Sequence, residues 1–218
     1  MKVDNEGKVV CLISGGIDSP VAVWLMMRKS LTPIFVHFDN VPFTDDTTRQ
    51  RTLEAVRKLR QKMPEKRVIL HIVPHGDNLA QFASNCQRNL TCVLCKRMMY
   101  RIAERIAVKE EAEAIVSGEI IGEHASQTVR NLLIQNEALT KQATLLRPLA
   151  GMNKIEVEKI AREIETFNIS TKPASCCTGA PDKPRTRARI EEVHKAERCL
   201  DIQGMVEKAL KNTETRDV

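Results

Sequence analysis

The sequence predicts an α/β protein with a doubly wound, mostly parallel five-stranded sheet and helices on both faces. Short apolar runs alternate with longer amphipathic segments along the chain, which is typical of parallel strands joined by helices. The first apolar run ends in a glycine-rich turn, and on such a sheet ligands bind at the carboxyl ends of strands. The predicted strands are Lys8–Ile13, Thr32–His37, Arg67–Val73, Ala114–Ser117 and Ala143–Leu146.

The amphipathic segments between these runs predict the helices. The first follows Ser19-Pro20, a pair typical of a helix start, because serine caps free N–H groups and proline fits the first turn. The polar tail, Asn212–Val218, is expected to fray. The predicted helices are Pro20–Arg28, Asp45–Gln61, Lys96–Glu110, Lys154–Glu165 with Asn153 as its cap, and Ile190–Cys199.

Composition is that of a soluble globular protein. No apolar run approaches the ~18 residues of a membrane span, and residues 1–6 contain no signal-peptide core, so we expect a cytoplasmic protein without a membrane partner. The net charge of +6 permits a polyanion such as RNA as partner. Aromatic residues make up only 3% of the chain, which argues against a platform that stacks single-stranded bases.

The most informative segment is the turn at residues 14–19, Ser-Gly-Gly-Ile-Asp-Ser. Small residues let backbone N–H groups approach a phosphate chain, and the following helix directs its N-terminus at the anion. The spacing matches neither the Walker pattern nor G-x-G-x-x-G. Asp18 beside phosphates is explained by a shared Mg²⁺ or by organising a leaving pyrophosphate. The alternative is an ordinary strand-to-helix turn.

This turn resembles the Ser-Gly-Gly-x-Asp-Ser signature of the PP-loop ATP pyrophosphatases, which have the adenine nucleotide alpha hydrolase-like fold. The resemblance implies cleavage of ATP between the α and β phosphates, adenylation of a carbonyl oxygen, and displacement of AMP by a nucleophile. Other segments resemble the catalytic domain of the tRNA 4-thiouridine synthases, the tRNA sulfurtransferases also linked to thiamine biosynthesis, from about Lys8 to Leu200. These segments are residues 36–44, 95–99, 117–119, 125–128, 146–149 and 176–178.

The resemblance implies a PP-loop ATP pyrophosphatase domain over residues 1–200 and a C-terminal helix and polar tail over residues 201–218. Those synthases usually carry a ferredoxin-like region and a THUMP domain before the catalytic domain, but seven residues precede the first predicted strand here. We therefore expect tRNA to be held by a separate RNA-binding partner or by a basic surface. The implied sulfur donor is a cysteine desulfurase or sulfide, and a homodimer is compatible with the sequence. The basic surface comprises Lys172, Lys183, Arg185, Arg187 and Arg189.

The resemblance also assigns roles at the carboxyl ends of the strands. His37 and Phe38 would lie beside the adenine or ribose, although His37 is equally well explained as a strand-end histidine bonded to a loop carbonyl. Lys96 and Arg97 are predicted at a helix start, where cations oppose the helix dipole, and would neutralise charge on the phosphates. The expected ATP ligands are Ser14, Gly15, Gly16, Asp18, Ser19, His37, Phe38, Arg97, Gly118 and Gln127.

Seven cysteines in a chain expected to be cytosolic argue for metal binding or reactive thiols. Cys92 and Cys95 form a Cys-x-x-Cys pair, which supplies half the ligands of a structural zinc. By resemblance to tRNA thiolases, Cys92, Cys95 and Cys177 would hold a [4Fe–4S] cluster whose free iron binds sulfide. Alternatively, one cysteine carries a persulfide and a second closes a disulfide. Ordinary structural cysteines are the remaining alternative.

Together these features predict an ATP-dependent tRNA sulfurtransferase of the 4-thiouridine synthase type. The C4 oxygen of a uridine would attack the α-phosphate of Mg²⁺-bound ATP, and sulfur from a cysteine or cluster would then displace AMP. The alternatives are a PP-loop ligase or thiolase acting on a small molecule, and a non-catalytic nucleotide-binding module. The expected catalytic residues are Asp18, Lys96, Cys92, Cys95, Cys176 and Cys177.

Overall fold

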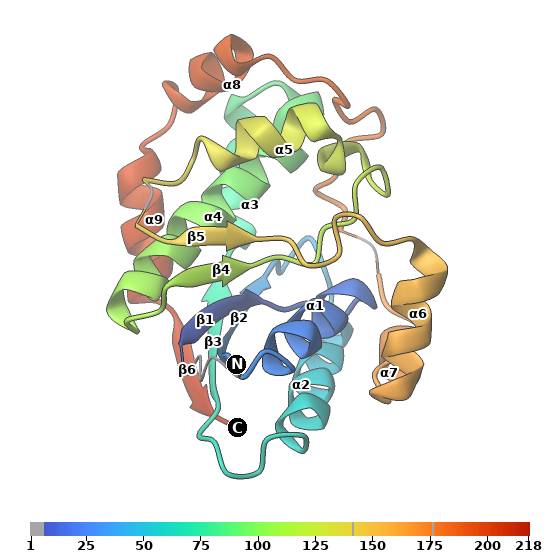
Figure 1. Ribbon diagram of the computed structural model, residues 1–218. Helices are drawn as coiled ribbons and strands as arrows, with labels where there is room; N and C mark the ends of the chain where they lie inside the picture. The colour runs from blue at the N-terminus through green and yellow to red at the C-terminus, as the bar shows by residue number, and fades with distance from the viewer. Residues whose placement is uncertain (1–6, 141, 176) are drawn as a thin grey trace.

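The computed structural model describes residues 7–140, 142–175 and 177–218. Within them a six-stranded sheet runs in the order β5-β4-β1-β2-β3-β6 (Figure 1). Strands β1 to β5 pair in parallel, and β6 pairs antiparallel with β3. The strands are β1 (Lys8–Leu12), β2 (Thr32–Asp39), β3 (Ile69–Pro74), β4 (Ala114–Val116), β5 (Thr144–Leu146) and β6 (Glu214–Asp217).

Helices cover both faces of this sheet, as the sequence predicts. Two short 3-10 helices, η1 (Arg88–Leu90) and η2 (Ala125–Gln127), precede α4 and α5. No helix in the described part of the chain has the length and apolar character needed to cross a membrane. The α-helices are α1 (Asp18–Met27), α2 (Asp46–Arg60), α3 (Gly76–Asn85), α4 (Thr91–Lys109), α5 (Val129–Asn136), α6 (Lys154–Glu163), α7 (Phe167–Ser170), α8 (Ile190–Glu197) and α9 (Ile202–Lys211).

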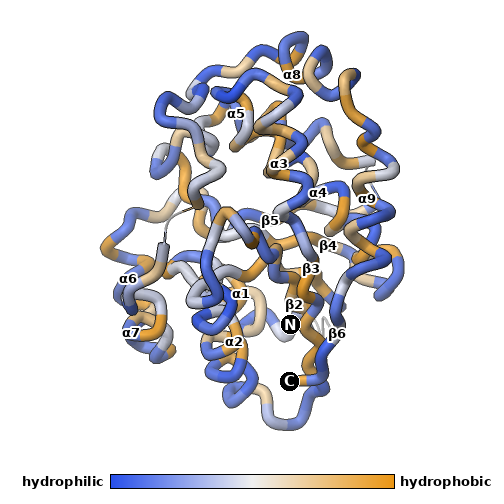
Figure 2. The backbone as a smooth tube through the Cα atoms, turned by 180° about the vertical axis from the view of Figure 1, so that it is seen from behind, coloured by the Kyte–Doolittle hydropathy of each residue, from blue (hydrophilic) through white to orange (hydrophobic). Residues whose placement is uncertain are grey.

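The core consists of two hydrophobic layers, one on each face of the sheet. Val9 and Cys11 of β1 pack into the layer formed with α1, α2 and α6. Val10 and Leu12 pack into the layer formed with α3, α4, α5, α8 and α9. Successive strand residues point to opposite faces, and both faces are covered, so β1 is apolar along almost its whole length. Figure 2 shows the same hydrophobic character along β2 and β3.

The C-terminal tail corrects two predictions. Instead of fraying, residues 214–217 form β6, so the sheet has six strands rather than five. An edge strand is held by backbone hydrogen bonds and faces solvent, so it does not need an apolar sequence. Ion pairs also hold this strand: Arg49 lies 2.6 Å from Glu214 and Arg67 lies 2.9 Å from Asp217.

The start of α4 corrects a third prediction. The helix begins at Thr91 rather than Lys96, so Cys92 and Cys95 lie in its first turn. Lys96 and Arg97 are therefore in the second turn, where the helix dipole acts less on them. The expectation that two cations open this helix was wrong.

The strand order places a switch point between β1 and β4. From β1 the chain moves to β2 and β3 on one side, and it then crosses to β4 and β5 on the other side. The loops that follow β1 and β4 therefore leave in opposite directions and open a crevice at the carboxyl edge of the sheet.

Candidate active site

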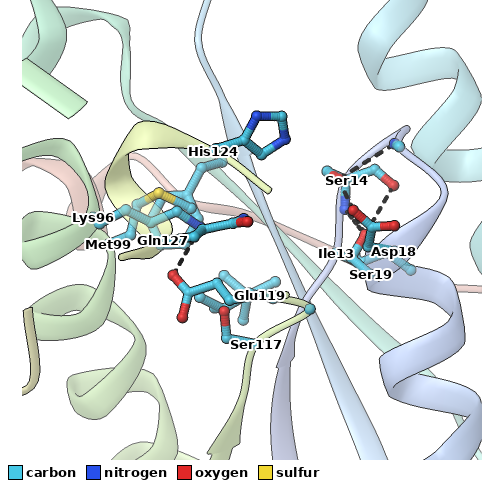
Figure 3. A pocket seen from close by; sticks show the side chains of 15 residues that line it. Ile13, Ser14, Asp18, Ser19, Lys96, Met99, Ser117, Glu119, His124 and Gln127 are labelled. Carbon is cyan, nitrogen blue, oxygen red and sulfur yellow. Dashed lines mark hydrogen bonds and ion pairs between the residues drawn. The ribbon is translucent and has the colours of Figure 1, made fainter. Parts of the chain in front are cut away.

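A cavity of about 230 Å³ lies at this switch point. The turn at residues 14–19 and the start of α1 form one wall, and α4, η2 and the segment after β4 form the opposite wall (Figure 3). His124 and Ser117 also line it, and the sequence analysis did not single out either residue. The predicted residues that line it are Ser14, Gly16, Asp18, Ser19, Phe38, Lys96, Gly118 and Gln127.

Two serines close the turn at residues 14–19. The Ser14 N–H donates to Ser19 Oγ at 2.8 Å, and the two hydroxyl oxygens are 3.0 Å apart. The Gly16 N–H donates to Ser14 Oγ at 3.3 Å. Helix α1 begins at Asp18 without a side-chain cap among the described residues, so Ser19 does not cap the helix. No side chain among the described residues caps the first N–H groups of α1, which leaves them available to an anion.

Gly15 and Gly118 allow close contacts between backbone segments. A Cβ at Gly15 would lie 2.9 Å from Arg51 Cβ, and one at Gly118 would lie 2.8 Å from Ser19 Cα. Gly118 therefore lets the end of β4 approach the start of α1, which brings the two cavity walls together. Gly15 does not line the cavity, and its place is against α2.

Two backbone carbonyl groups of the turn accept hydrogen bonds from side chains that do not line the cavity. Arg51 donates to Gly15 O through Nε at 3.0 Å and Nη2 at 2.6 Å, and Ser170 Oγ donates to Gly16 O at 3.1 Å. Arg51 also donates to Lys172 O at 2.8 Å. Side chains of two elements, α2 and α7, therefore hold the turn.

Asp18 and Glu119 place one carboxylate on each wall of the cavity. The Asp18 carboxylate pairs with Lys154 at 2.6 Å. Glu119 Oε2 accepts from Tyr100 at 2.7 Å and from Arg147 at 2.5 Å, and Lys96 Nζ lies 3.6 Å from Oε1.

Burial raises the pKa of Glu119, but Lys96 and Arg147 outweigh this and hold that pKa below its usual range. Glu119 Oε1 finds no hydrogen-bond partner among the described residues. Glu119 and Arg147 lie in the segments 117–119 and 146–149 that carry the family resemblance, but their contact with each other and with Tyr100 arises only through the fold.

Like Gly15, two further predicted ATP ligands lie outside the cavity. His37 is buried, and its Nδ1 lies 3.2 Å from Ile13 O and 3.3 Å from Thr52 Oγ1, which is the strand-end alternative raised for it. Arg97 is also buried, and its guanidinium donates to both carboxylate oxygens of Glu197 at 2.7 and 2.9 Å. The structure brings neither side chain into the cavity.

A second cavity, of about 270 Å³, shares Lys96 and Met99 with the first. Cys92, Cys95 and Cys177 line it, whereas Cys176 lies outside the described residues. No group of three or more His, Cys, Asp or Glu side chains in the described residues is placed to hold a metal ion. The geometry shown therefore does not fit the expected cluster on these three cysteines.

His75 is a functional candidate that the sequence analysis missed. Its Nε2 lies 3.3 Å from Cys95 Sγ, Asn78 Nδ2 lies 3.2 Å from its Nδ1, and the Phe38 ring meets it edge-on at 5.3 Å. Burial lowers the pKa of His75 to about 3 and raises the pKa of Cys95 to about 12. Both groups are therefore neutral near pH 7. His75 directly follows β3, just as His37 ends a predicted strand. The argument that drew attention to His37, its position at the carboxyl end of a strand, therefore applies to His75 as well.

The predicted basic surface is partly neutralised. Lys172 pairs with Glu54, and Arg185 pairs with Glu192 at 2.9 Å. Lys183, Arg187 and Arg189 are exposed. Among the described residues, the surface therefore presents three exposed cations that make no ion pair, fewer than the five cations that the sequence suggests.

Comparison with known proteins identifies the family. The family described as thiamine biosynthesis protein (ThiI) matches residues 4–202. The chain belongs to the ThiI family. A probable tRNA sulfurtransferase of Methanosarcina acetivorans is 38% identical over 97% of this chain, and one of Brevibacillus brevis is 36% identical over 100% of it.

One solved structure is similar over nearly the whole chain. It is a 4-thiouridine synthetase in complex with RNA and bound ATP, with a TM-score of 0.92, 34% identity and 97% of this chain covered. The chain spans about half the length of the ThiI relatives it matches, 51% and 54% of the two named above and 55% of this structure. The PP-loop fold predicted from the sequence is thereby confirmed.

Proposed function

We propose that this chain is an ATP-dependent tRNA sulfurtransferase that adenylates the C4 oxygen of a uridine and replaces it with sulfur. The observation that carries the proposal is the shared wall of the two cavities. Lys96 lines both the cavity at the phosphate-binding turn and the cavity with Cys92, Cys95 and Cys177. A base activated in the first cavity would thus lie next to thiols in the second.

Nucleotide binding follows from the first cavity. The N–H groups at the start of α1 and the Ser14 and Ser19 hydroxyls would bind the phosphates, with Phe38 and Gln127 on the adenosine side. Lys96 would stabilise charge that develops on the α-phosphate during attack. The ATP bound in the similar 4-thiouridine synthetase structure supports this assignment.

A magnesium ion fits the same turn. Mg²⁺ is usually held through one or two carboxylates together with substrate phosphates, and Asp18 offers such a carboxylate in the cavity. When bound, the ion would neutralise charge on the leaving pyrophosphate.

Sulfur would reach the base as a persulfide. A donor such as a cysteine desulfurase transfers sulfane sulfur to one cysteine, whose terminal sulfur attacks C4 of the adenylated uridine and expels AMP. A second cysteine then attacks the resulting disulfide, which releases 4-thiouridine and leaves a Cys–Cys disulfide for an external thiol to reduce. We favour this route over the cluster because the described residues gather no metal-ligand set.

The cysteine variants test this proposal. We expect Cys92→Ala and Cys95→Ala to abolish 4-thiouridine formation and the release of AMP that accompanies it, while a single tRNA-dependent release of pyrophosphate continues, because the first cavity is unchanged. Residues that act as a unit lose activity non-additively, so the double variant should resemble the worse single variant. Cys199→Ala is the matched control, since Cys199 is exposed and distant from both cavities. Full thiolation by either single variant would refute the shared thiol site.

We infer that tRNA binds across the exposed Lys183, Arg187 and Arg189, together with a separate RNA-binding partner. When cations contact phosphates, the affinity for tRNA falls as the salt concentration rises. The log–log slope is roughly −0.7 to −0.9 per neutralised phosphate. A triple alanine variant should therefore bind tRNA more weakly and show a shallower salt slope than the wild type. Unchanged affinity and slope, measured with cell extract as a source of partner, would exclude this surface.

A further inference from the structure

One oxygen of the Glu119 carboxylate has no hydrogen-bond partner among the described residues. Oε2 accepts from Tyr100 at 2.7 Å and from Arg147 at 2.5 Å, whereas Oε1 accepts from no described donor. The side chain is only 2% exposed, and it lines the cavity at residues 14–19. A buried acceptor without a donor costs free energy. In a ligand cavity, such an atom is explained by a donor that the ligand supplies.

The surrounding side chains fix the position and the charge of this carboxylate. Tyr100 and Lys96 approach it from α4 and Arg147 from the segment after β5, and Arg147 is itself held by Asn136 Oδ1 at 2.8 Å. Lys96 and Arg147 keep the pKa of Glu119 below its usual range. The carboxylate is therefore ionised near neutral pH, and in this form it can only accept hydrogen bonds.

The free oxygen faces Lys96 without being bonded to it. Lys96 Nζ lies 3.6 Å from Glu119 Oε1, which is longer than a hydrogen bond (Figure 3). The Lys96 side chain is 26% exposed, and its flexible stem lets the ammonium group turn away from the carboxylate. When Lys96 turns to the α-phosphate, as the proposed function requires, Oε1 is left open to the acceptor base.

Adenylation of a uridine creates the need for such an acceptor. As O4 bonds to phosphorus, positive charge develops on N3 and the N3–H group becomes strongly acidic, so even a weakly basic carboxylate can take its proton. O4 and N3 are bonded to the same carbon, so a uridine with O4 at the phosphate beside Lys96 has N3 next to Glu119. Asp18, the second carboxylate among the described lining residues, lies on the opposite wall and is paired with Lys154.

We propose that Glu119 Oε1 binds the N3–H group of the uridine and takes its proton as O4 attacks the α-phosphate. The N3–H electron pair forms the N3=C4 double bond, and the C4=O4 π pair forms the O4–P bond. The bond from phosphorus to pyrophosphate breaks, and the proton stays on Glu119. This inference rests on the adenylation of uridine proposed above.

The same carboxylate completes the proton balance of the sulfur step. When the second cysteine releases 4-thiouridine, the nucleoside leaves as its anion, and Glu119 returns the proton to N3. The contact also selects the base. Cytidine carries a lone pair at N3 instead of a proton, and this lone pair would face the carboxylate without a donor between them, which disfavours cytidine.

The acidity of N3–H tests this role directly. Single-turnover release of pyrophosphate would be measured with tRNA transcripts that contain uridine or 5-fluorouridine, whose N3–H is more acidic. We expect Glu119→Gln to be slower than the wild type by about 100-fold with uridine and by less than about tenfold with 5-fluorouridine. The rate of the variant with uridine should also rise with pH towards the pKa of N3–H. Binding of α,β-methylene-ATP should be unchanged.

Two further variants separate proton transfer from a structural effect. Tyr100→Phe is the matched control, because it removes a hydrogen bond to Oε2 alone, so any loss should be equal for the two transcripts. Glu119→Asp keeps the charge of the cluster but withdraws the carboxylate, so its loss should again be larger with uridine. This variant applies the same test if Glu119→Gln does not fold.

The outcomes distinguish this inference from the proposed function. If a folded Glu119 variant loses equally with both transcripts, or loses nothing, Glu119 does not take the N3 proton and the inference is wrong. Loss of the ATP analogue by Glu119→Gln, with equal losses for both transcripts, would likewise assign Glu119 a structural role. If the wild type releases no pyrophosphate with either transcript, the adenylation of uridine fails, and this inference fails with it.

Discussion

At the scale of single residues, the chemistry of a side chain depends more on its surroundings than on its residue type. His37 of β2 and His75, which follows β3, illustrate this. His37 is committed to a loop carbonyl and a threonine hydroxyl, whereas His75 reaches a cysteine of the second cavity. Both are buried, so neither is charged near neutral pH, and their difference lies in the partner that the fold supplies.

The cysteines differ in reactivity for the same reason. Burial raises the pKa of Cys95 to about 12, so its reactive thiolate is scarce at pH 8, whereas Cys199 is exposed. We expect iodoacetamide to modify Cys199 well before Cys95, as followed by peptide mass spectrometry. The Cys95 rate should rise about tenfold per pH unit up to its pKa. If Cys95 reacts as fast as Cys199 at pH 8, its thiol is not buried as the structure shows.

Some residues of the site are neighbours in the sequence, whereas others are far apart in it. The turn at residues 14–19 is continuous, so its motif predicts Ser14, Gly16, Asp18 and Ser19 correctly as cavity residues. The pairs Asp18–Lys154 and Lys96–Glu119 join distant segments. No local pattern predicts such pairs, because only the folded sheet brings their elements together.

At the scale of elements, α8 is attached to α4 by a cluster of charges rather than by a ligand site. Glu197, the last residue of α8, accepts from Arg97 at 2.7 Å and from Arg101 at 2.7 Å. Burial alone would raise the pKa of Glu197, but hydrogen bonds from both arginines lower it to about 2. Arg97, expected to bind phosphate, instead holds these two helices together.

This cluster predicts an acid-sensitive stability. Because the folded pKa of Glu197 is depressed, its contribution is full above the unfolded pKa of about 4.5 and is lost as pH falls towards 2. We expect Glu197→Gln to lower the free energy of unfolding by about 2 kcal/mol at pH 7. The loss should be much smaller at pH 3. Urea unfolding at the two pH values measures this, and an equal loss at both would contradict it. Glu191→Gln, on the exposed side of α8, is the control.

Several helices and strands could not be predicted from the pattern of hydrophobic residues. Helix α5 was not predicted because Val129 and Leu133 are 67% and 52% exposed, so its apolar residues do not follow one buried face. Helix α3 buries only Leu79 and Phe82 among its large apolar residues. Strand β6 is polar, and its pairing depends on the exposed edge of β3. Strands β1 to β4 were predictable because burial on both faces keeps them apolar, whereas β5 is apolar although it is only partly buried.

At the scale of the whole molecule, the sheet places the cavity at residues 14–19 and the cavity lined by Cys92, Cys95 and Cys177 on either side of Lys96. The carboxyl edge of β1 and β4 supplies the first cavity, and the first turn of α4 supplies two cysteines of the second. The phosphate-binding turn and fold class could be predicted from the sequence. The shared wall could not, since it depends on how α4 packs across the sheet.

The central claim is that a uridine oxygen is adenylated in the first cavity and leaves with AMP when sulfur arrives from the second. Transfer RNA labelled with ¹⁸O at the C4 position of its uridines would be incubated with ATP, Mg²⁺ and a desulfurase with cysteine. Mass spectrometry of the AMP then tests the claim most directly. We predict one ¹⁸O atom in the AMP phosphate for each 4-thiouridine formed. Unlabelled AMP alongside 4-thiouridine, or ADP as the main nucleotide product, would contradict it.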